Sequence, residues 1–469
     1  MTFDVGLPVF SVLAAEAGHV NLGTELGLWT LIPFASLLLC IAILPLVAGH
    51  WWEHNKSKGI VAAVCAVPIA LYFATAFGQT GIHNLIEKGE EYLSFMVLLT
   101  SLFVITGGIY IRGSLSGTPL ANTAMLGLGA VLANLIGTTG ASVLLIRPLL
   151  RANQQRTRVA HVVVFFIFVV SNCGGLLTPL GDPPLFLGYL KGVPFEWTLQ
   201  LLPQWALTNL ILLVIFNIWD QMALAREDKE RAGSQLEQVQ HHEKLGLDGA
   251  HNLLFLLGVV IAIYASGRGL FNNDKPWPFG VQEGLMALLC GAAYTTTSKV
   301  NREKNRFSFG PIIEVAVLFA GIFVTMAPAL AILNSWGKGE REVFGIAFGL
   351  DQPWQFFWAT GFLSSFLDNA PTYLTFAATA CGLNKVAVEG SYMREFLAIG
   401  PEAVKLLAAI SCGAVLMGAN TYIGNGPNFM VKAIAEENNV KMPSFFGYMA
   451  YSGAILIPTF IVVTLVFFR

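Results

Sequence analysis

The chain has 469 residues, of which 55% are hydrophobic and only 12% are charged. A soluble domain carries about 25% charged residues, so the composition excludes an ordinary soluble protein and favours a helical bundle in a bilayer. The net charge of −2 gives no reason to expect a nucleic-acid partner.

The chain opens with an apolar run, Leu7–Ala17, that is too short to cross a bilayer and lacks a basic flank. It fits an interfacial segment, and a cleaved signal that ends near Ala17 is the alternative. Each membrane span needs roughly 20 apolar residues, and many such runs follow. In chain order they cover 27–49, 60–78, 92–111, 119–150, 159–190, 197–219, 250–267, 282–298, 310–334, 354–380, 402–431 and 445–468.

Two of these runs are too long for one span and are interrupted by polar residues near the middle. Run 119–150 is broken at Gly137–Ser142, and run 354–380 is broken at Ser364–Thr372. Each half has about ten residues, too few to cross. We predict two re-entrant helical hairpins, each entering and leaving on one side, because such non-helical backbone is tolerated where protein or water covers it.

A nine-residue pattern occurs twice, 243 residues apart, inside two other apolar runs. Thr178–Phe186 reads TPLGDPPLF and Thr421–Phe429 reads TYIGNGPNF, so both fit T-x-x-G-[D/N]-x-P-x-F. Glycine, proline and a polar side chain at bilayer depth are typical of a broken helix. Broken helices in corresponding places of two halves indicate the ion or substrate site of a secondary transporter.

The basic residues allow a test of this topology. If the two long runs are hairpins and every other run crosses once, one side receives 17 Lys and Arg and the other receives 10. The richer side should face the cytoplasm, which places loops 147–158 and 299–309 there. We therefore expect a multi-pass protein of the bacterial inner (cytoplasmic) membrane.

The predicted fold is an all-α polytopic membrane protein with an inverted-topology repeat, two re-entrant hairpins and two broken transmembrane helices. Each repeat contains a helix, a hairpin, a broken helix and a helix. The polar segment 220–249 should be an amphipathic or partly disordered cytoplasmic loop with a solvated charged face. The expected domains are an N-terminal segment with two scaffold helices (1–91), repeat 1 (92–219), a linker with two connecting helices (220–309) and an inverted repeat 2 (310–469).

The polar side chains of the hairpins and broken helices are the candidate ion or substrate site. A dehydrated cation needs several oxygen ligands, which hydroxyls, amides, carboxylates and freed backbone carbonyls can supply. The candidates are Asp182, Asp368, Asn172, Thr178, Asn369, Thr421, Asn425, Thr138, Thr139, Ser142 and Asn420, with Asn428 beside them. The residues that break the helices are Gly181, Pro183, Pro184, Gly424 and Pro427.

Asp182 and Asp368 are the strongest candidates, because a carboxylate at bilayer depth is costly. One carboxylate can hold a proton or a cation but not comfortably both, which is sufficient for exchange. The alternative is that each aspartate caps a helix. The hydroxyl and amide residues can likewise serve as hydrogen-bonding contacts between helices.

Other titratable groups are weaker candidates. Glu314 and His161 lie near predicted interfaces, Arg147 can extend its charge to the cytoplasmic edge, and His241-His242 falls in a polar loop. The six cysteines lack the spacing of a zinc site or a disulfide framework. We interpret them as small buried apolar side chains: Cys40, Cys65, Cys173, Cys290, Cys381 and Cys412.

Four segments resemble the ion transporter superfamily: NLIGTTGAS at 134–142, SNCGGLLTPLGDPP at 171–184, DNAPT at 368–372 and IGNGPN at 423–428. The dicarboxylate branch typically has Ser-Asn-Thr at both hairpin tips, and this chain does not. The acidic Gly-Asp-Pro-Pro segment is most similar to that of the NhaD-type sodium/proton antiporters.

This resemblance implies exchange of Na⁺ or Li⁺ for H⁺ by an elevator-like motion, often in a homodimer. The Na⁺ ligands would be among Asp182, Asn172, Asp368, Asn369 and Asn425. No cofactor is expected besides the coupling ions Na⁺ and H⁺, and the partners are the bilayer and a small ion. The rival hypothesis is a cation-coupled carrier of citrate or a dicarboxylate. The sequence lacks HExxH, a nucleophile elbow and a phosphate loop, so we do not expect an enzyme or catalytic residues.

Overall fold

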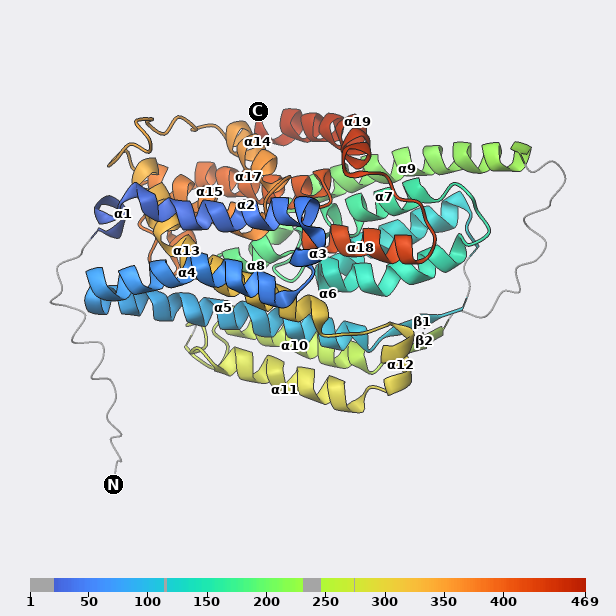
Figure 1. Cartoon of the computed structure of the whole chain (residues 1–469), viewed down its shortest axis with the longest axis horizontal. Coiled ribbons are helices and arrows are strands. Elements are labelled where there is room, and N and C mark those ends of the chain that lie inside the picture. The colour runs from blue at the N-terminus through green and yellow to red at the C-terminus, as the bar shows by residue number, and fades with distance from the viewer. Residues whose placement is uncertain (1–20, 114–115, 231–245, 274) are drawn as a thin grey trace, which may run out of the picture.

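The structure is a computed structural model that describes residues 21–113, 116–230, 246–273 and 275–469 (Figure 1). The predicted interfacial segment Leu7–Ala17 and the pair His241-His242 lie outside these residues. The all-α prediction is confirmed. One short antiparallel ribbon is present, in which β1 (Tyr110–Arg112) pairs with β2 (Gly246–Asp248).

Most helices run along the long axis of the molecule (Figure 1). Eight helical segments of the described chain are long and apolar enough to cross a bilayer, as a multi-pass membrane protein requires. The N-terminal part contains α1 (Leu22–Glu25), η2 (Leu28–Thr30), α2 (Leu31–Val47), α3 (Gly49–Trp52), α4 (Asn55–Ala76) and α5 (Gly78–Gly107).

The middle of the chain contains α6 (Pro119–Ala152), α7 (Ala160–Val169), η3 (Cys173–Leu176), α8 (Pro183–Leu190), η4 (Phe195–Leu201), α9 (Leu202–Glu230), α10 (Asn252–Gly267), α11 (Val281–Thr296) and α12 (Lys299–Lys304). The last part contains α13 (Gly310–Gly337), α14 (Pro353–Ser364), α15 (Asn369–Leu383), α16 (Tyr392–Ala398), α17 (Pro401–Met417), η5 (Gly418–Asn420), α18 (Gly426–Glu437), α19 (Phe445–Val463) and the π-helical turn η6 (Thr464–Phe468).

Helix α6 folds back on itself at Gly137, whose φ of 76° lies in the left-handed region that glycine favours. A straight helix would separate Asn122 from Asn153 by roughly 45 Å, yet their amides exchange two hydrogen bonds of 3.0 and 2.8 Å. Helices α14 and α15 likewise turn back on each other, and the rings of Phe356 and Phe376 lie 6.5 Å apart. Both long runs are therefore helical hairpins.

The two broken helices lie at the centre of the bundle. Every residue of α7 from His161 to Val169 is buried, and so is every residue of α17 from Leu406 to Met417. A helix that is buried on all sides has no polar face, which explains the absence of amphipathic periodicity in these runs. In each case the helix stops, passes through a 3₁₀ turn, and resumes as α8 or α18.

The helix boundaries repeat with constant shifts along the chain. Helices α8 and α9 start at Pro183 and Leu202, and α18 and α19 start 243 residues later at Gly426 and Phe445. The second arm of each hairpin ends at Ala152 or at Leu383, a shift of 231 residues. These shifts support a duplicated architecture, while the domain division itself stays a prediction.

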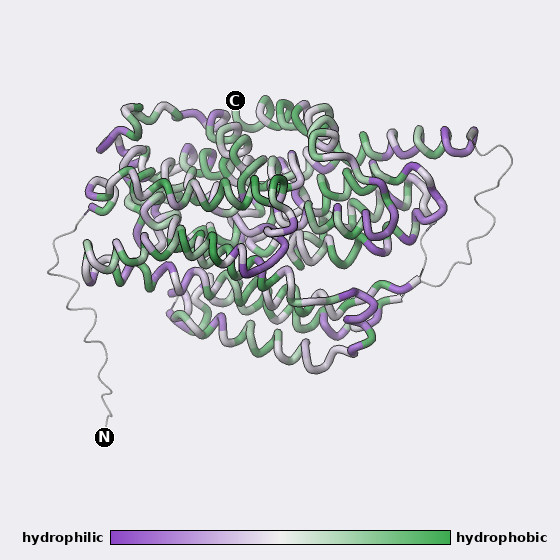
Figure 2. The backbone as a smooth tube through the Cα atoms, in the orientation of Figure 1, coloured by the Kyte–Doolittle hydropathy of each residue, from purple (hydrophilic) through white to green (hydrophobic). Residues whose placement is uncertain are grey.

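Polar residues gather at the two ends of the bundle (Figure 2). At one end Lys304 lies near Asp248, Arg306 pairs with Glu437, and Arg156 pairs with Asp220. Segments around residues 112, 156, 220, 248, 304 and 437 thus share an end, as the topology predicts. At the other end Arg268 pairs with Glu196, and the backbone N–H of Met393 donates to Lys191.

Two expected boundaries were wrong. Helix α5 begins at Gly78 rather than near residue 92, so Lys88 lies inside a helix, where it is buried against Glu91 at 3.0 Å. Helix α9 continues to Glu230, so the first part of the expected loop 220–249 is helical. Its acidic residues Asp220 and Glu227 are buried rather than solvated. Both boundaries were wrong for the same reason. Charged residues that pair in the protein interior have the same sequence pattern as a polar loop.

The grouping of the loops predicts which positions react from the same side of the membrane. In a background without the six native cysteines, Gln154→Cys and Glu303→Cys should react with an impermeant thiol reagent from one side only. Glu389→Cys should react only from the other side. All three positions are exposed. Labelling of positions 154 and 389 from the same side would contradict the fold's orientation in the bilayer.

Candidate functional site

The breaks in the two central helices depend on glycine and proline at fixed positions. A Cβ added to Gly181 would lie 2.2 Å from the carbonyl oxygen of Gly175, and one added to Gly424 would lie 2.6 Å from that of Gly418. Only glycine allows the backbone to approach itself this closely. Proline then starts each second half, at the first turns of α8 and α18, where its missing N–H costs nothing.

Asp182 and Asn425 occupy the N-cap positions of α8 and α18, yet neither side chain caps its own helix. Both have extended backbone conformations, with φ of −142° and −154°. Their side chains point across the break instead, and the amide of Asn425 donates to Oδ1 of Asp182 at 3.1 Å. The capping alternative therefore does not explain Asp182.

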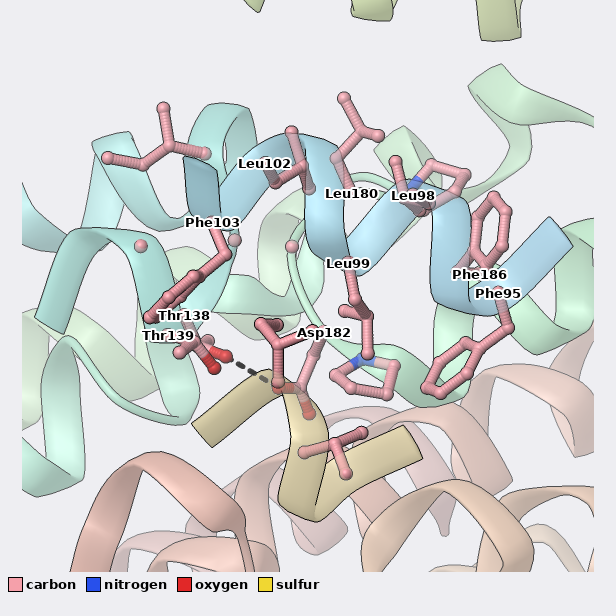
Figure 3. A pocket seen from close by; sticks show the side chains of 18 of the residues that line it. Phe95, Leu98, Leu99, Leu102, Phe103, Thr138, Thr139, Leu180, Asp182 and Phe186 are labelled. Carbon is pink, nitrogen blue, oxygen red and sulfur yellow. Dashed lines mark hydrogen bonds between the residues drawn. The ribbon is translucent and has the colours of Figure 1, made fainter. Parts of the chain in front are cut away.

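Asp182 is 1% exposed and is held by three neutral side chains. The Thr138 hydroxyl donates to Oδ1 at 2.8 Å, from the tip of the first hairpin (Figure 3). The amide of Asn369, from the tip of the second hairpin, donates to Oδ2. Among the described residues no Lys or Arg pairs with this carboxylate. A fully buried carboxylate thus has polar partners but no countercharge.

The four residues are related by the shifts found in the helix boundaries. Thr138 and Asn369 differ by 231 positions and lie at equivalent hairpin tips, while Asp182 and Asn425 differ by 243 positions and lie at equivalent helix starts. The centre is therefore built twice from matching positions. Two asymmetries are chemical: only the first of the two helix starts carries an acid, and only the second hairpin tip does, at Asp368, where the first has Gly137.

A second layer of amides joins the two broken helices. Asn172 donates to the side-chain oxygen of Asn428 at 2.7 Å and accepts from Asn425 at 3.2 Å. Asn428 in turn donates to the carbonyls of Gly418 and Thr421 at 2.8 and 2.9 Å. Both side chains are fully buried, so these bonds satisfy backbone groups that the broken helices leave without helical partners.

The remaining candidates lie near the centre but make other contacts. Thr178 and Thr421 donate to the backbone oxygens of Asn134 and Ser365 in the hairpins. Ser142 bonds Ser171 at 2.8 Å, and Asn420 donates to the Ser365 hydroxyl at 2.9 Å. Asp368 accepts from the N–H of Ala370 at 3.0 Å and so caps α15. Helix capping is thus the observed contact of Asp368.

A cavity of about 80 Å³ opens beside Asp182. Thr138 and Thr139 line it together with the carboxylate, and Leu98, Leu99 and Leu102 of α5 cover it (Figure 3). Asp182 is the only charged residue among its lining. The described chain contains no cluster of three or more His, Cys, Asp or Glu that could hold a metal. A cation at this centre would need amide and hydroxyl oxygens beside one carboxylate.

Sequence reasoning missed the side chains that hold the broken helices from outside. Trp205 of α9 donates to the carbonyl of Gly174 at 2.8 Å, and Tyr448 of α19 donates to that of Ala419 at 2.9 Å. Asn209 and Ser452 similarly donate to the carbonyls of Cys173 and Asn420. Both pairs differ by 243 positions. Extending the nine-residue repeat along the chain at this shift would have identified them.

The weaker candidates lie away from this centre. Glu314 of α13 pairs with Lys58 of α4 at 2.7 Å. His161 is buried, and its Nε2 lies 2.8 Å from Asp220. Arg147 is half-buried on the second arm of the first hairpin. Within the described part of the chain, none of these three residues forms a hydrogen bond or an ion pair with Asp182.

Known proteins resemble the chain along nearly its whole length. A family model described as "Putative citrate transport" matches residues 23–468. An uncharacterized transporter of Synechocystis sp. is 23% identical over 458 residues, which cover 92% of this chain and 92% of that protein.

The amide layer predicts a stability effect that is separable from transport. Asn428→Ala removes two donated bonds and one accepted bond from a buried position, so it should lower the free energy of unfolding by about 2–3 kcal/mol. Thermal unfolding of the detergent-solubilised protein, followed by tryptophan fluorescence, measures this loss. Gln221→Ala removes an exposed amide on α9 and should change it by less than about 0.5 kcal/mol. Equal midpoints for the two variants would contradict the role of Asn428.

Proposed function

We propose a function on the premise that the chain belongs to the family described as putative citrate transport, whose model matches residues 23–468. Family membership and the membrane-spanning helices make it a multi-pass membrane transporter. We infer that it exchanges Na⁺ or Li⁺ for H⁺, with Asp182 as the group that alternates between a proton and the cation. The observation that carries this inference is a buried carboxylate with neutral partners and no basic one.

A buried carboxylate without a countercharge is unstable as an isolated anion. It gains stability when a proton neutralises it or when a cation binds beside it. Either event removes the need for the other, and this competition couples the two ions. In the cation-free state, hydrogen bonds from Thr138, Asn369 and Asn425 hold the carboxyl group in place.

The amide side chains can donate hydrogen bonds to the carboxylate or offer their oxygens as ligands to a cation. Rotation about the Cβ–Cγ bond of Asn369 or Asn425 exchanges its NH₂ group for its carbonyl oxygen. The centre would then present amide oxygens, the Thr138 hydroxyl and the Asp182 carboxylate to a cation. Hard cations prefer such oxygen ligands, and Asn172 adds another amide behind Asn425.

The size and charge of the cavity favour a small cation over an organic anion. Pockets for organic ligands occupy roughly 300–1,000 Å³, whereas the cavity beside Asp182 occupies about 80 Å³. Citrate would also have to lie next to a carboxylate with no lysine or arginine lining the cavity. The negative charges of citrate and of Asp182 would repel each other and so oppose binding.

An elevator-like motion fits the distribution of polar and apolar surfaces around the centre. Leu98, Leu99 and Leu102 of α5 and Ile312 and Val315 of α13 cover the side of the cavity away from the polar network. Apolar contacts are non-directional, so two such surfaces can shift past each other without breaking specific bonds. We propose that the hairpins and broken helices move together against this part of α5 and α13.

The alternative function is a cation-coupled carrier of citrate or another organic anion. The family description favours it. In this case the cation beside Asp182 would supply the positive charge that the cavity lacks, and the anion would bind after the cavity enlarges. The N-terminal ends of α8 and α18 would contribute their dipoles.

Transport in inverted membrane vesicles distinguishes the two functions. With a preset pH gradient across the vesicle membrane, addition of Na⁺ should dissipate the gradient, because Na⁺ displaces the proton from Asp182. Citrate or succinate added without Na⁺ should leave the gradient unchanged. Fluorescence quenching of a pH-sensitive dye measures the response, with vesicles that lack the protein as the control. Citrate uptake without any Na⁺-driven proton movement would favour the anion carrier.

Replacement of the carboxylate tests its role in coupling. Asp182→Asn keeps the shape of the side chain but cannot release a proton, so exchange should fall to the background of vesicles without the protein. The fold should survive, because the equivalent position, Asn425, already carries an amide. Asn425→Ala should weaken apparent Na⁺ affinity about tenfold, as expected for one lost hydrogen-bonding partner of a charged group, while proton coupling persists.

The matched comparison for this test is Asp368→Asn, which alters a carboxylate that caps α15. Asparagine also caps helices well, so this variant should keep a substantial part of the exchange activity. Unchanged exchange by Asp182→Asn between pH 6.5 and 9, together with its loss in Asp368→Asn, would transfer the coupled proton to Asp368.

A further inference from the structure

A basic pocket of about 660 Å³ lies at the end of the bundle that the charge count assigns to the cytoplasm. It is far larger than the cavity beside Asp182 and is formed by the loop after α6, the end of α9 and the segment before α19. Arg156, Arg158, Arg226 and Lys441 line it, and no acidic residue does. An anion is therefore the kind of ligand that its charges favour.

Arg156 is the most informative residue of this pocket. Only 4% of its side chain is exposed. Its Nη1 pairs with Asp220 at 2.7 Å and donates to the backbone oxygen of Gly117 at 3.2 Å. Its Nε lies 3.8 Å from Oε1 of Glu227, an ion pair too long for a hydrogen bond, and its Nη2 makes no hydrogen bond within the described chain. A buried guanidinium is normally saturated because each unmade bond is costly, so the Nη2 group fits a missing oxygen ligand.

The residues behind the pocket hold Arg156 in place. Asp220 binds Arg156, His161 and Asn122, and all four side chains are buried. Glu227 accepts from the backbone N–H groups of Thr157 and Arg158 at 3.3 and 2.9 Å, which fixes the loop that carries Arg156. The guanidinium is thus preorganised, and a phosphate group matches its planar arrangement of donors.

The surface next to the pocket indicates the source of this phosphate. Leu210, Val214, Ile218 and Met222 recur every four residues along one face of α9, and about half or more of each side chain is exposed. This apolar stripe ends at Met222, which lines the pocket. Trp219 and Tyr451 also line it, with stacked rings 5.6 Å apart, and such aromatic residues are typical of the membrane–water boundary.

We propose that this pocket binds the headgroup of an anionic phospholipid, whose acyl chains lie along the apolar stripe of α9. Basic pockets between membrane helices on the cytoplasmic side suit such headgroups. The phosphate lies against Nη2 of Arg156, and Arg226 and Lys441 supply further positive charge from the exposed rim of the pocket. The proposal is independent of which ion the protein transports.

The test uses the purified full-length protein in detergent, with thermal unfolding as the readout. Phosphatidylglycerol should raise the unfolding midpoint, and phosphatidylcholine at the same concentration should not. In the double variant Arg226→Gln/Lys441→Gln, the phosphatidylglycerol concentration for half of the effect should rise about thirtyfold, which corresponds to two basic residues at a charged membrane surface. Both side chains are exposed, so the variant should fold.

The matched control is Lys56→Gln/Lys299→Gln, which removes the same charge from exposed positions outside the pocket. It should respond to phosphatidylglycerol as the unmodified protein does. Equal weakening in both double variants would overturn the pocket as the site. Equal stabilisation by inorganic phosphate or glycerol phosphate would overturn the lipid assignment in favour of a soluble anion. Equal stabilisation by phosphatidylcholine would overturn the requirement for a negative headgroup.

Discussion

The central constraint on this molecule is that a helix broken inside a membrane must find partners for the backbone groups it releases, because lipid offers none. Two helices are broken here, and protein side chains bind several of the carbonyls that the breaks release. Trp205 and Asn209 of α9 bind carbonyls of the first break, while Tyr448 and Ser452 of α19 bind those of the second. The hairpins accept from Thr178 and Thr421. The tight glycine contacts at Gly181 and Gly424 serve the same requirement, because they let each break fold closely on itself.

The duplication allows each residue of that centre to be compared with the matching residue of the other repeat. Matching positions carry Thr138 and Asn369 at the hairpin tips and Asp182 and Asn425 at the helix starts. The start of α18 carries an amide at position 425, so a broken helix of this kind can begin without an acid. A buried carboxylate is maintained at a cost of several kcal/mol, and a function that uses its charge accounts for that cost better than packing does.

The sequence predicted the fold class, both hairpins and both broken helices, because each depends on local features: run length, glycine, proline and polar residues in apolar runs. One repeated pattern also identified Asp182 and Asn425 as candidates, and the structure brings their side chains within 3.1 Å of each other. The sequence could not predict that Asp368 caps its helix whereas Asp182 does not, since this depends on side-chain direction. The burial of Asp220, Glu227 and Lys88 was missed for a related reason. Charged residues that pair across distant segments look like solvated loops when each segment is read alone.

The buried cluster around Asp220 also limits how the molecule can move. Asp220 of α9 binds Asn122 of the first hairpin and His161 of the first broken helix. Removing one partner from such a buried charged group costs about 3–5 kcal/mol, so a transport cycle that separated α9 from these elements would be slow. Tyr448 and Ser452 connect α19 to the second broken helix in the same way. Under the proposed elevator-like motion, a rigid unit that carries Asp182 would include α9 and α19. Sliding against α5 and α13 would also have to separate Lys191 from Glu91 of α5 and Asn334 of α13 from the carbonyl of Ala378 in α15. On this view the apolar stripe of α9 faces lipid while the unit moves, and a headgroup held by Arg156 would travel with it.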